Sequence, residues 1–175
     1  NGAMRAIYNS SVPTVARVNG AAAGGGFGLA LACDIAVAAK SAFFVATFGP
    51  KLGIVPDLGT TWNLPHKAGR ARALGLTMLG DRISAEQAEA WGLIWKVVED
   101  DQLDAEVELI TKKLARASAD TMTRIRSVTD AALSNNFSDQ LDLEMEHQAV
   151  LIPKNMTEGA RAFMEKREPE FPGRN

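Results

Sequence analysis

Residues 19–35, NGAAAGGGFGLALACDI, constrain the fold of this chain more than any other segment. They follow a β-branched run typical of a strand, and Gly24, Gly25 and Gly26 lead from it into a helical run. Glycines at the start of a helix let a ligand oxygen approach main-chain N–H groups, and the helix dipole adds positive potential there. The segment therefore predicts either an anion or oxyanion site or a tight strand–helix junction without a ligand.

Spacing excludes two nucleotide-binding motifs for these glycines. No starting point in the cluster gives the three glycines of a dinucleotide fingerprint, and Asp34 follows too closely to be its ribose-binding acid. No Gly-Lys-Ser/Thr sequence follows, so the cluster is not a Walker A loop. An acyl oxyanion is the ligand that fits best.

The first half of the chain alternates strand and helix patterns, and the second half is helical. Ser84 and Gln87 form a capping box for a helix that ends near Trp91. Strands are expected at residues 13–20, 33–39, 42–47 and 93–99. Apolar helical stripes are formed by Ala71, Leu74, Gly75 and Met78; by Leu103, Val107, Ile110 and Leu114; by Met122, Ile125 and Val128; and by Leu141, Met145 and Ala149. The pattern predicts an α/β fold with a helical tail.

Composition favours a small-molecule partner. The 175 residues are 46% hydrophobic and carry a net charge of -2 in mixed-sign runs, so no basic face for nucleic acid is indicated. No apolar run reaches membrane-spanning length, and no secretory signal opens the chain, which predicts a cytoplasmic protein. The single cysteine, Cys33, is expected to be a buried hydrophobe, and no metal site is expected. The sequence begins at Asn1 without methionine, so further residues are expected upstream.

The stretch LGIVPDLGTTW places one carboxylate, Asp57, among apolar residues. Apolar neighbours such as Ile54 and Val55 would exclude water and favour the neutral acid, which suits a group that takes and returns a proton. Alternatively, Asp57 caps a helix that begins near Gly59. The residues by themselves favour the cap.

Four segments of the chain resemble the enoyl-CoA hydratase/isomerase, or crotonase, superfamily. They are PTVARVNGAAAGGGFGLALACDIAVAA, KLGIVPDLGTTWNLP, AGRARALGLTMLGDRISAEQAEAWGLIWKVV and EGARAFMEKREPEF, and the resemblance extends over essentially the whole chain. It is strongest to the branch of phenylacetate-pathway isomerases that act on ring-1,2-epoxyphenylacetyl-CoA. It implies a crotonase-like (ClpP/crotonase) α/β spiral of ββα units, with residues 1–115 as the core, residues 116–175 as a helical oligomerisation region, and the N-terminal part of the fold missing.

The resemblance also implies roles for the two segments described above. In crotonases two backbone N–H groups hold the thioester oxygen, and the position of Gly25 supplies one of them, while the other comes from a segment upstream of this chain. Hydratases use two glutamates, at positions that correspond to Gly28 and to the segment FGPKLG, and neither is present. Isomerases carry one acid at the position of Asp57. The residues implied to contact substrate around these two groups are Gly24, Gly26, Phe27, Pro56 and Leu58.

The implied function is therefore isomerisation of an acyl-CoA, either by shifting a double bond or by opening a ring epoxide. A Δ3-to-Δ2 enoyl-CoA isomerase and a catalytically silent acyl-CoA-binding relative are the alternatives. Phe163 and Lys166 match positions that contact coenzyme A, which is part of the substrate, so no separate cofactor is expected. The resemblance further implies a homotrimer or a dimer of trimers. His66 and His147 are assigned no role.

Overall fold

The computed structural model describes residues 1–171, which form two compact units. The first unit comprises residues 1–10 and 14–109, and the second comprises residues 11–13 and the described residues from 110 onward. All strands of the described residues lie in the first unit, and the second contains helices. The expected α/β class is thereby confirmed.

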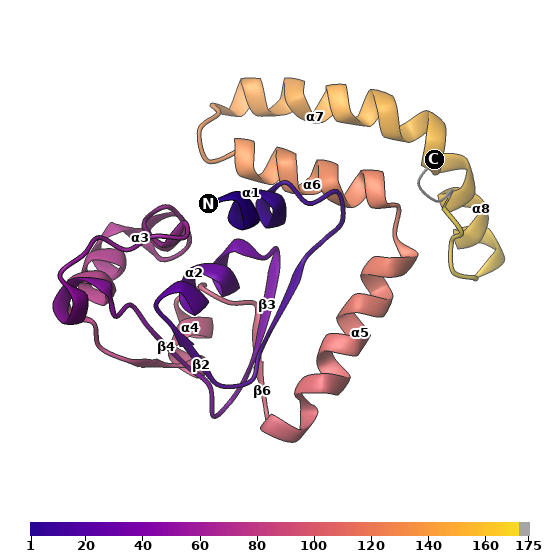
Figure 1. Cartoon of the computed structure of the whole chain (residues 1–175). Helices are drawn as coiled ribbons and strands as arrows, with labels where there is room; N and C mark the ends of the chain where they lie inside the picture. The colour runs from indigo at the N-terminus through magenta and orange to yellow at the C-terminus, as the bar shows by residue number, and fades with distance from the viewer. Residues whose placement is uncertain (172–175) are drawn as a thin grey trace. The chain divides into compact units, whose positions relative to one another are not determined.

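Two small sheets form the centre of the first unit (Figure 1). The first joins β1 (Val15–Val18), β3 (Ile35–Ala39) and β6 (Lys96–Val98) in parallel, in the order β1-β3-β6. The second has the order β2-β4-β5 and joins β2 (Ala21–Ala23) in parallel to β4 (Phe43–Val45), with β5 (Ile83–Ser84) antiparallel to β4. Because parallel strands are covered on both faces, β3 is apolar throughout and its last four residues are buried.

Helices cover these sheets. Phe27 of α2 is fully buried and packs against Phe44 of β4, with ring centroids 5.3 Å apart. Ser84 caps α4 by accepting a hydrogen bond from the Gln87 N–H, as the sequence predicted. The helices of this unit are α1 (Gly2–Tyr8), α2 (Gly25–Ala32), α3 (Thr60–Leu79), α4 (Ala85–Ala90) and the start of α5 (Leu103–Arg116), with a π-helical turn η1 (Phe48–Leu52) and a 3-10 turn η2 (Asp100–Gln102).

Helix α3 is interrupted at Gly69, whose φ of 80° and ψ of 161° are not helical. The predicted apolar stripe on this helix is wrong in detail, because Met78 is 67% exposed and Ala71 is also exposed. Ala73 and Leu76 are the buried residues after the break. Leu74 and Gly75 of the predicted stripe are partly covered, so the buried face is centred between Ala73 and Leu76 and leaves Ala71 and Met78 at its exposed edge.

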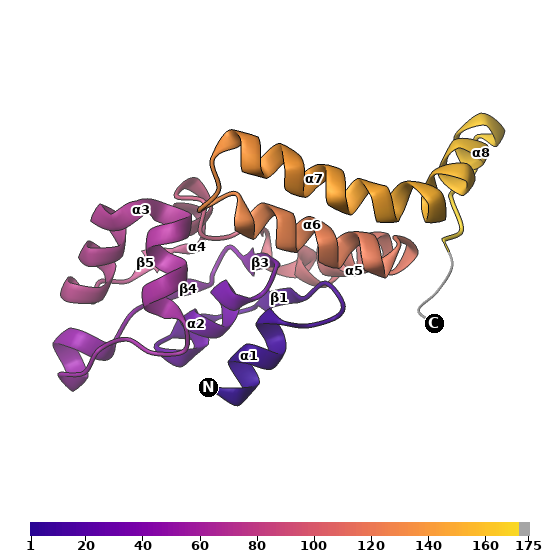
Figure 2. The ribbon, with the colours of Figure 1, turned by 90° about the horizontal axis from the view of Figure 1, so that it is seen from above.

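The second unit contains the rest of α5 together with α6, α7, η3 and α8. Figure 1 shows α6 and α7 side by side, and Figure 2 shows the same pair from above. Ser118 caps α6 and Asn136 caps α7, each through a side-chain oxygen that accepts a backbone hydrogen bond. The bounds are α6 (Ala119–Ala131), α7 (Phe137–Leu151), η3 (Ile152–Met156) and α8 (Thr157–Glu165).

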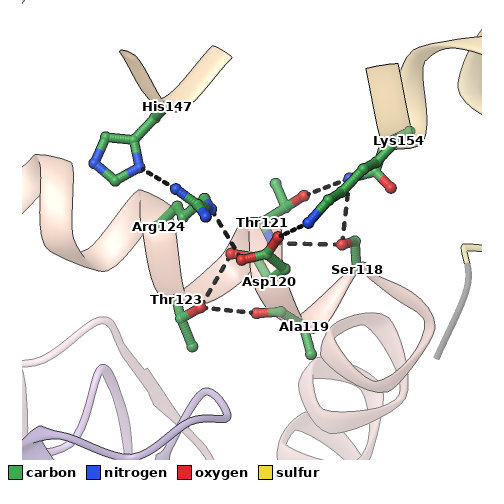
Figure 3. A network of polar contacts seen from close by, with 9 residues as sticks. Ser118, Ala119, Asp120, Thr121, Thr123, Arg124, His147 and Lys154 are labelled. Carbon is green, nitrogen blue, oxygen red and sulfur yellow. Dashed lines mark hydrogen bonds and ion pairs between the residues drawn. The ribbon is translucent and has the colours of Figure 1, made fainter. Parts of the chain in front are cut away.

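A polar network centred on Asp120 joins three of these elements (Figure 3). Its carboxylate accepts a hydrogen bond from Arg124 at 2.9 Å and pairs with Lys154 of η3 at 3.4 Å. Hydrogen bonding to Arg124 lowers the pKa of Asp120. Arg124 also donates to Nδ1 of His147 on α7 at 3.0 Å, since a guanidinium cannot accept. His147 thus has a structural contact that the sequence did not predict.

The structure shows which way the apolar stripe predicted on α7 faces. Leu143 and His147 are partly covered, whereas Leu141 is 47% exposed and Met145 is 66% exposed. The predicted apolar stripe on this helix therefore lies on its outer side. Among the helices of residues 1–171, none has both the length and the apolar character needed to cross a membrane.

Candidate active site

The glycine cluster forms the first turn of α2. Gly24 precedes the helix with φ of 52° and ψ of −117°, a conformation that favours glycine, and its N–H donates to the Val45 carbonyl at 2.9 Å. Its own carbonyl accepts from the N–H groups of Phe27 and Gly28 at 3.0 and 3.3 Å. The N–H groups of Gly25 and Gly26 have no acceptor within residues 1–171. The start of α2 therefore presents two adjacent donors that a ligand oxygen could accept from.

Asp57 begins a tight turn that leads into α3. The N–H of Thr60 donates to the Asp57 carbonyl at 3.0 Å, and both central residues, Leu58 and Gly59, have positive φ, of 51° and 76°. This is the pattern of a type I′ turn. Gly59 is the N-cap of α3, and no side chain caps the helix. The Asp57 carboxylate is exposed and has no partner in the described chain, so the helix-capping alternative is wrong.

Leu58 brings the Asp57 turn into contact with the glycine helix. A Cβ atom added to Gly25 would lie 2.8 Å from Leu58 Cδ1, and one added to Gly28 would lie 2.7 Å from the Leu58 carbonyl oxygen. Both distances are shorter than van der Waals contact. Because Gly25 and Gly28 have no side chains, Leu58 packs directly against the backbone of α2. Asp57 precedes Leu58 in the chain and therefore lies next to the helix that carries the Gly25 N–H.

The expected exclusion of water around Asp57 does not hold within the described residues. Ile54 is 53% exposed and Val55 is 77% exposed, while Pro56 and Leu58 are partly covered. Residues 53–57 belong to no helix or strand. Because no part of this loop holds Ile54 and Val55 against the Asp57 carboxylate, both side chains stay exposed and water reaches the carboxylate.

Thr60 is the residue of this region that the sequence reasoning missed. Its side chain is fully buried, and its hydroxyl oxygen has no hydrogen-bond partner in the described chain. The hydroxyl lies 2.7 Å from the position of a Cβ on Gly28. A threonine directly after a turn glycine carries no special sequence signal, because threonine is common at helix starts for capping reasons.

A cavity of about 440 Å³ lies on another side of α2. Gly26, Leu29 and Cys33 contribute from the helix, and the remaining lining comes from residues 15–22 and Ala30. Asp57 does not line this cavity. Cys33 is partly exposed rather than buried as expected, because it ends α2 where the cavity opens; partial burial raises the pKa of its thiol.

The predicted coenzyme A contacts lie in the second unit. Phe163 of α8 is 82% exposed, and Lys166 follows the helix in a left-handed conformation with φ of 53°. Their role stays a prediction. Within residues 1–171, no group of three or more His, Cys, Asp or Glu side chains could hold a metal ion.

Comparison with known proteins gives one consistent family. Residues 2–174 match the enoyl-CoA hydratase/isomerase family model. The chain is 43% identical over 175 residues to 1,2-epoxyphenylacetyl-CoA isomerase of Escherichia coli (strain K12). It is 41% identical over 172 residues to a probable enoyl-CoA hydratase of Rhodobacter capsulatus. These alignments cover 99% and 98% of this chain and 66% of each relative, so the chain spans about two thirds of their length.

Solved structures agree with the sequence matches. The enoyl-CoA hydratase from Polaromonas sp. JS666 is 36% identical and superposes with a TM-score of 0.90, covering 97% of this chain and 66% of that one. The enoyl-CoA hydratase from Bacillus anthracis is 33% identical, with a TM-score of 0.91 over 99% of this chain and 67% of that one. These likenesses confirm the crotonase-like fold expected from the sequence.

Proposed function

The chain belongs to the enoyl-CoA hydratase/isomerase family, and from that premise we propose that the protein is an acyl-CoA isomerase. Its substrate is an acyl-CoA thioester, and coenzyme A enters as part of that substrate. The names of the relatives include both an isomerase and a hydratase, so the choice between these reactions depends on the residues of this chain.

The packing at Gly28 is the observation that carries the choice. The family resemblance implies a glutamate at this position in hydratases, whereas here the Leu58 carbonyl oxygen and the Thr60 hydroxyl each lie 2.7 Å from the position that its Cβ would take. The carbonyl belongs to the main chain and cannot rotate away. A glutamate fits there only if the turn is rebuilt, and Asp57 is the acid that lies next to the first turn of α2, since Asp34 follows the other end of the helix and is bonded to Thr14.

The proposed chemistry uses two parts of the site. The Gly25 N–H donates to the thioester oxygen and stabilises the negative charge that develops there when the carbon next to the thioester loses a proton. Asp57 accepts this proton and returns it to a different carbon, which moves the double bond without net gain or loss of atoms. With a ring epoxide as substrate, the protonated form of Asp57 donates to the epoxide oxygen while the ring expands, and Asp57 takes the proton back from the rearranged product, so that no atom is gained or lost.

Two further features of the proposal lie in the second unit. Phe163 and Lys166 contact coenzyme A, and the protein assembles as a homotrimer or a dimer of trimers. The exposed apolar side chains of Leu141 and Met145 on α7 support assembly, because neighbouring exposed apolar side chains are typical of a subunit contact.

A catalytically silent relative that binds acyl-CoA is the second candidate. It is favoured by the exposure of Asp57 and its apolar neighbours, which leaves the proton-transfer group in water. Such a protein would bind acyl-CoA without turnover. The two candidates therefore differ in rate and agree in affinity.

Substitution of Asp57 by asparagine tests the proposal in the longest natural form of the protein. Asparagine keeps shape and polarity but cannot exchange a proton, so isomerisation of a 3-enoyl-CoA should fall by about 10²–10⁴-fold. Acyl-CoA affinity and melting temperature should stay close to the parent, because the Asp57 carboxylate is exposed and has no hydrogen-bond or ion-pair partner in the described chain. Asp101→Asn, at an exposed aspartate of η2, is the matched control and should leave the rate unchanged.

Three results would contradict parts of this proposal. A near-parental rate for Asp57→Asn would place the acid elsewhere. Binding of acyl-CoA by the parent without isomerisation would favour the silent relative. Rapid addition of water to a 2-enoyl-CoA, measured beside isomerisation, would favour a hydratase.

A further inference from the structure

We propose that Leu58 is the positioning residue of this site, because its side chain joins the turn that carries Asp57 to the helix that carries the Gly25 N–H. The inference rests on the proposed function for its catalytic consequence. Its structural part, a contact between Leu58 and Gly25, stands on geometry and is tested separately below.

The backbone of Leu58 is in a conformation that leucine disfavours. Its φ is 51°, and Lys166 is the other non-glycine residue of the described chain with positive φ. In this region the Cβ atom approaches the following carbonyl oxygen, which is why Gly, Asn and Asp dominate both central positions of type I′ turns. Leucine has no side-chain hydrogen bond that could compensate. Something outside the turn must therefore stabilise Leu58.

The contact with α2 provides that stabilisation. Leu58 Cδ1 lies 2.8 Å from the ideal Cβ position of Gly25, and Leu58 Cβ lies 3.1 Å from that of Gly28. Glycines at these two positions, three residues apart, leave a gap on one face of the helix. The Leu58 side chain fills it. Gly26, which points elsewhere, has no heavy atom within 4 Å of its ideal Cβ position.

This arrangement couples the two groups of the proposed chemistry. One end of Leu58 touches the glycine whose N–H holds the thioester oxygen, and its backbone continues directly from Asp57. Loss of the side chain would free the turn to adopt other conformations, and Asp57 would no longer stay at a fixed distance from the Gly25 N–H. Because the Leu58 contact orients Asp57 toward the reacting carbon, its loss should lower kcat by a larger factor than it raises KM.

Three substitutions of Leu58 separate the backbone from the side chain. Leu58→Ala removes the contact and keeps the strained backbone, and kcat should fall about 10-fold or more. Leu58→Gly relaxes the backbone but also lacks the contact, so it should not recover the rate. Leu58→Met supplies an apolar side chain of similar volume that can still reach Gly25, and it should keep most of the parental rate. Leu79→Ala, at a 67% exposed leucine at the end of α3, is the control and should resemble the parent.

A double-mutant cycle followed by thermal unfolding tests the contact without any substrate. Gly25→Ala should lower the melting temperature by about 3 °C or more in the parent, where the new methyl meets Leu58 Cδ1. The same change should cost much less in the Leu58→Ala background. Gly28→Ala should lower it equally in both, because the atoms it meets include the Leu58 carbonyl and Cβ, which alanine keeps. Gly26→Ala should have little effect in either.

The outcomes distinguish this inference from the proposed function. Equal effects of Gly25→Ala in both backgrounds would overturn the contact between Leu58 and Gly25. Parental kcat for Leu58→Ala in an active isomerase would overturn the positioning role, as would full recovery by Leu58→Gly. An inactive parent would contradict the proposed function, and the cycle would still decide whether the contact exists.

Discussion

The hydroxyl oxygen of Thr60 lies 2.7 Å from the point that a Cβ atom on Gly28 would occupy. Thr60 is fully buried and its hydroxyl has no partner in the described chain. Residue 60 therefore takes up space that residue 28 leaves, although 31 positions separate them in the sequence. The residue type that fits at position 28, in the first turn of α2, therefore depends on Thr60 in the first turn of α3.

This relationship predicts that a hydratase glutamate cannot simply be restored. Gly28→Glu should lower the free energy of unfolding by about 1–3 kcal/mol or more, because its Cβ meets main-chain and buried atoms. It should add no hydration of crotonyl-CoA. Denaturant unfolding and a hydration assay measure the two effects. Gly26→Glu, where the backbone is open, is the control for stability. Efficient hydration by Gly28→Glu at parental stability would contradict this prediction. It would show that the turn from Asp57 to Thr60 can move away from position 28 at little cost in free energy.

The exposed side of α7 predicts a defined effect on assembly. Leu141 and Met145 lie one helical turn apart with 47% and 66% of their surfaces exposed. If this stripe joins subunits, Met145→Glu should shift the protein from an oligomer toward a monomer, because assembly would bury the new charge. Light scattering after size-exclusion chromatography measures the mass. Gln102→Glu adds the same charge at an exposed position of η2 in the first unit and should leave the oligomer intact. A monomeric parent at micromolar concentration would reject assembly altogether.

Glu158 predicts a specific response to acid. Its carboxylate accepts from Arg167 at 2.7 and 3.1 Å and from the Glu170 N–H at 2.9 Å, and these bonds lower its pKa from the ordinary 4.5 to about 2. A depressed pKa means that the folded state binds this proton less readily than the unfolded state. The stabilisation is therefore fully present above pH 4.5 and is lost as the pH falls toward 2.

The difference between parent and Glu158→Gln isolates this contribution. The variant should lose less stability than the parent between pH 5 and about 2.5, as followed by thermal unfolding. Glu146→Gln, at an exposed glutamate of α7, should follow the parent. Parallel curves for parent and Glu158→Gln would mean that the pairing with Arg167 does not form in solution.

Much of the architecture follows from local patterns in the sequence. The four expected strands appear as β1, β3, β4 and β6, since each is an apolar or β-branched run bounded by turn residues. The two others were not predicted. β2 consists of three alanines and β5 of two residues, so neither has enough β-branched character to stand out.

Contacts between distant segments account for what the sequence could not predict. An apolar stripe on α7 is visible in the sequence, but the pattern is the same whether the stripe faces its own unit or a partner. The glycine at position 28 is equally visible, whereas its contacts with Leu58 and Thr60 require the folded chain. For the same reason, Gly25→Val would displace Leu58 as well as block the N–H, so lost turnover in that variant would have two causes.

The break at Gly69 separates the helical paths of the two halves of α3. In a continuous helix, one inserted residue turns everything beyond it by about 100°, which would disturb each packed side chain further along. Here the helical path stops at Gly69, so a change in length there is absorbed before it reaches the turns that begin at Thr60. The second half of α3 nevertheless reaches the Asp57 loop by another path, since Thr77 and Gly80 pack closely against Gly49 and Pro50 of η1.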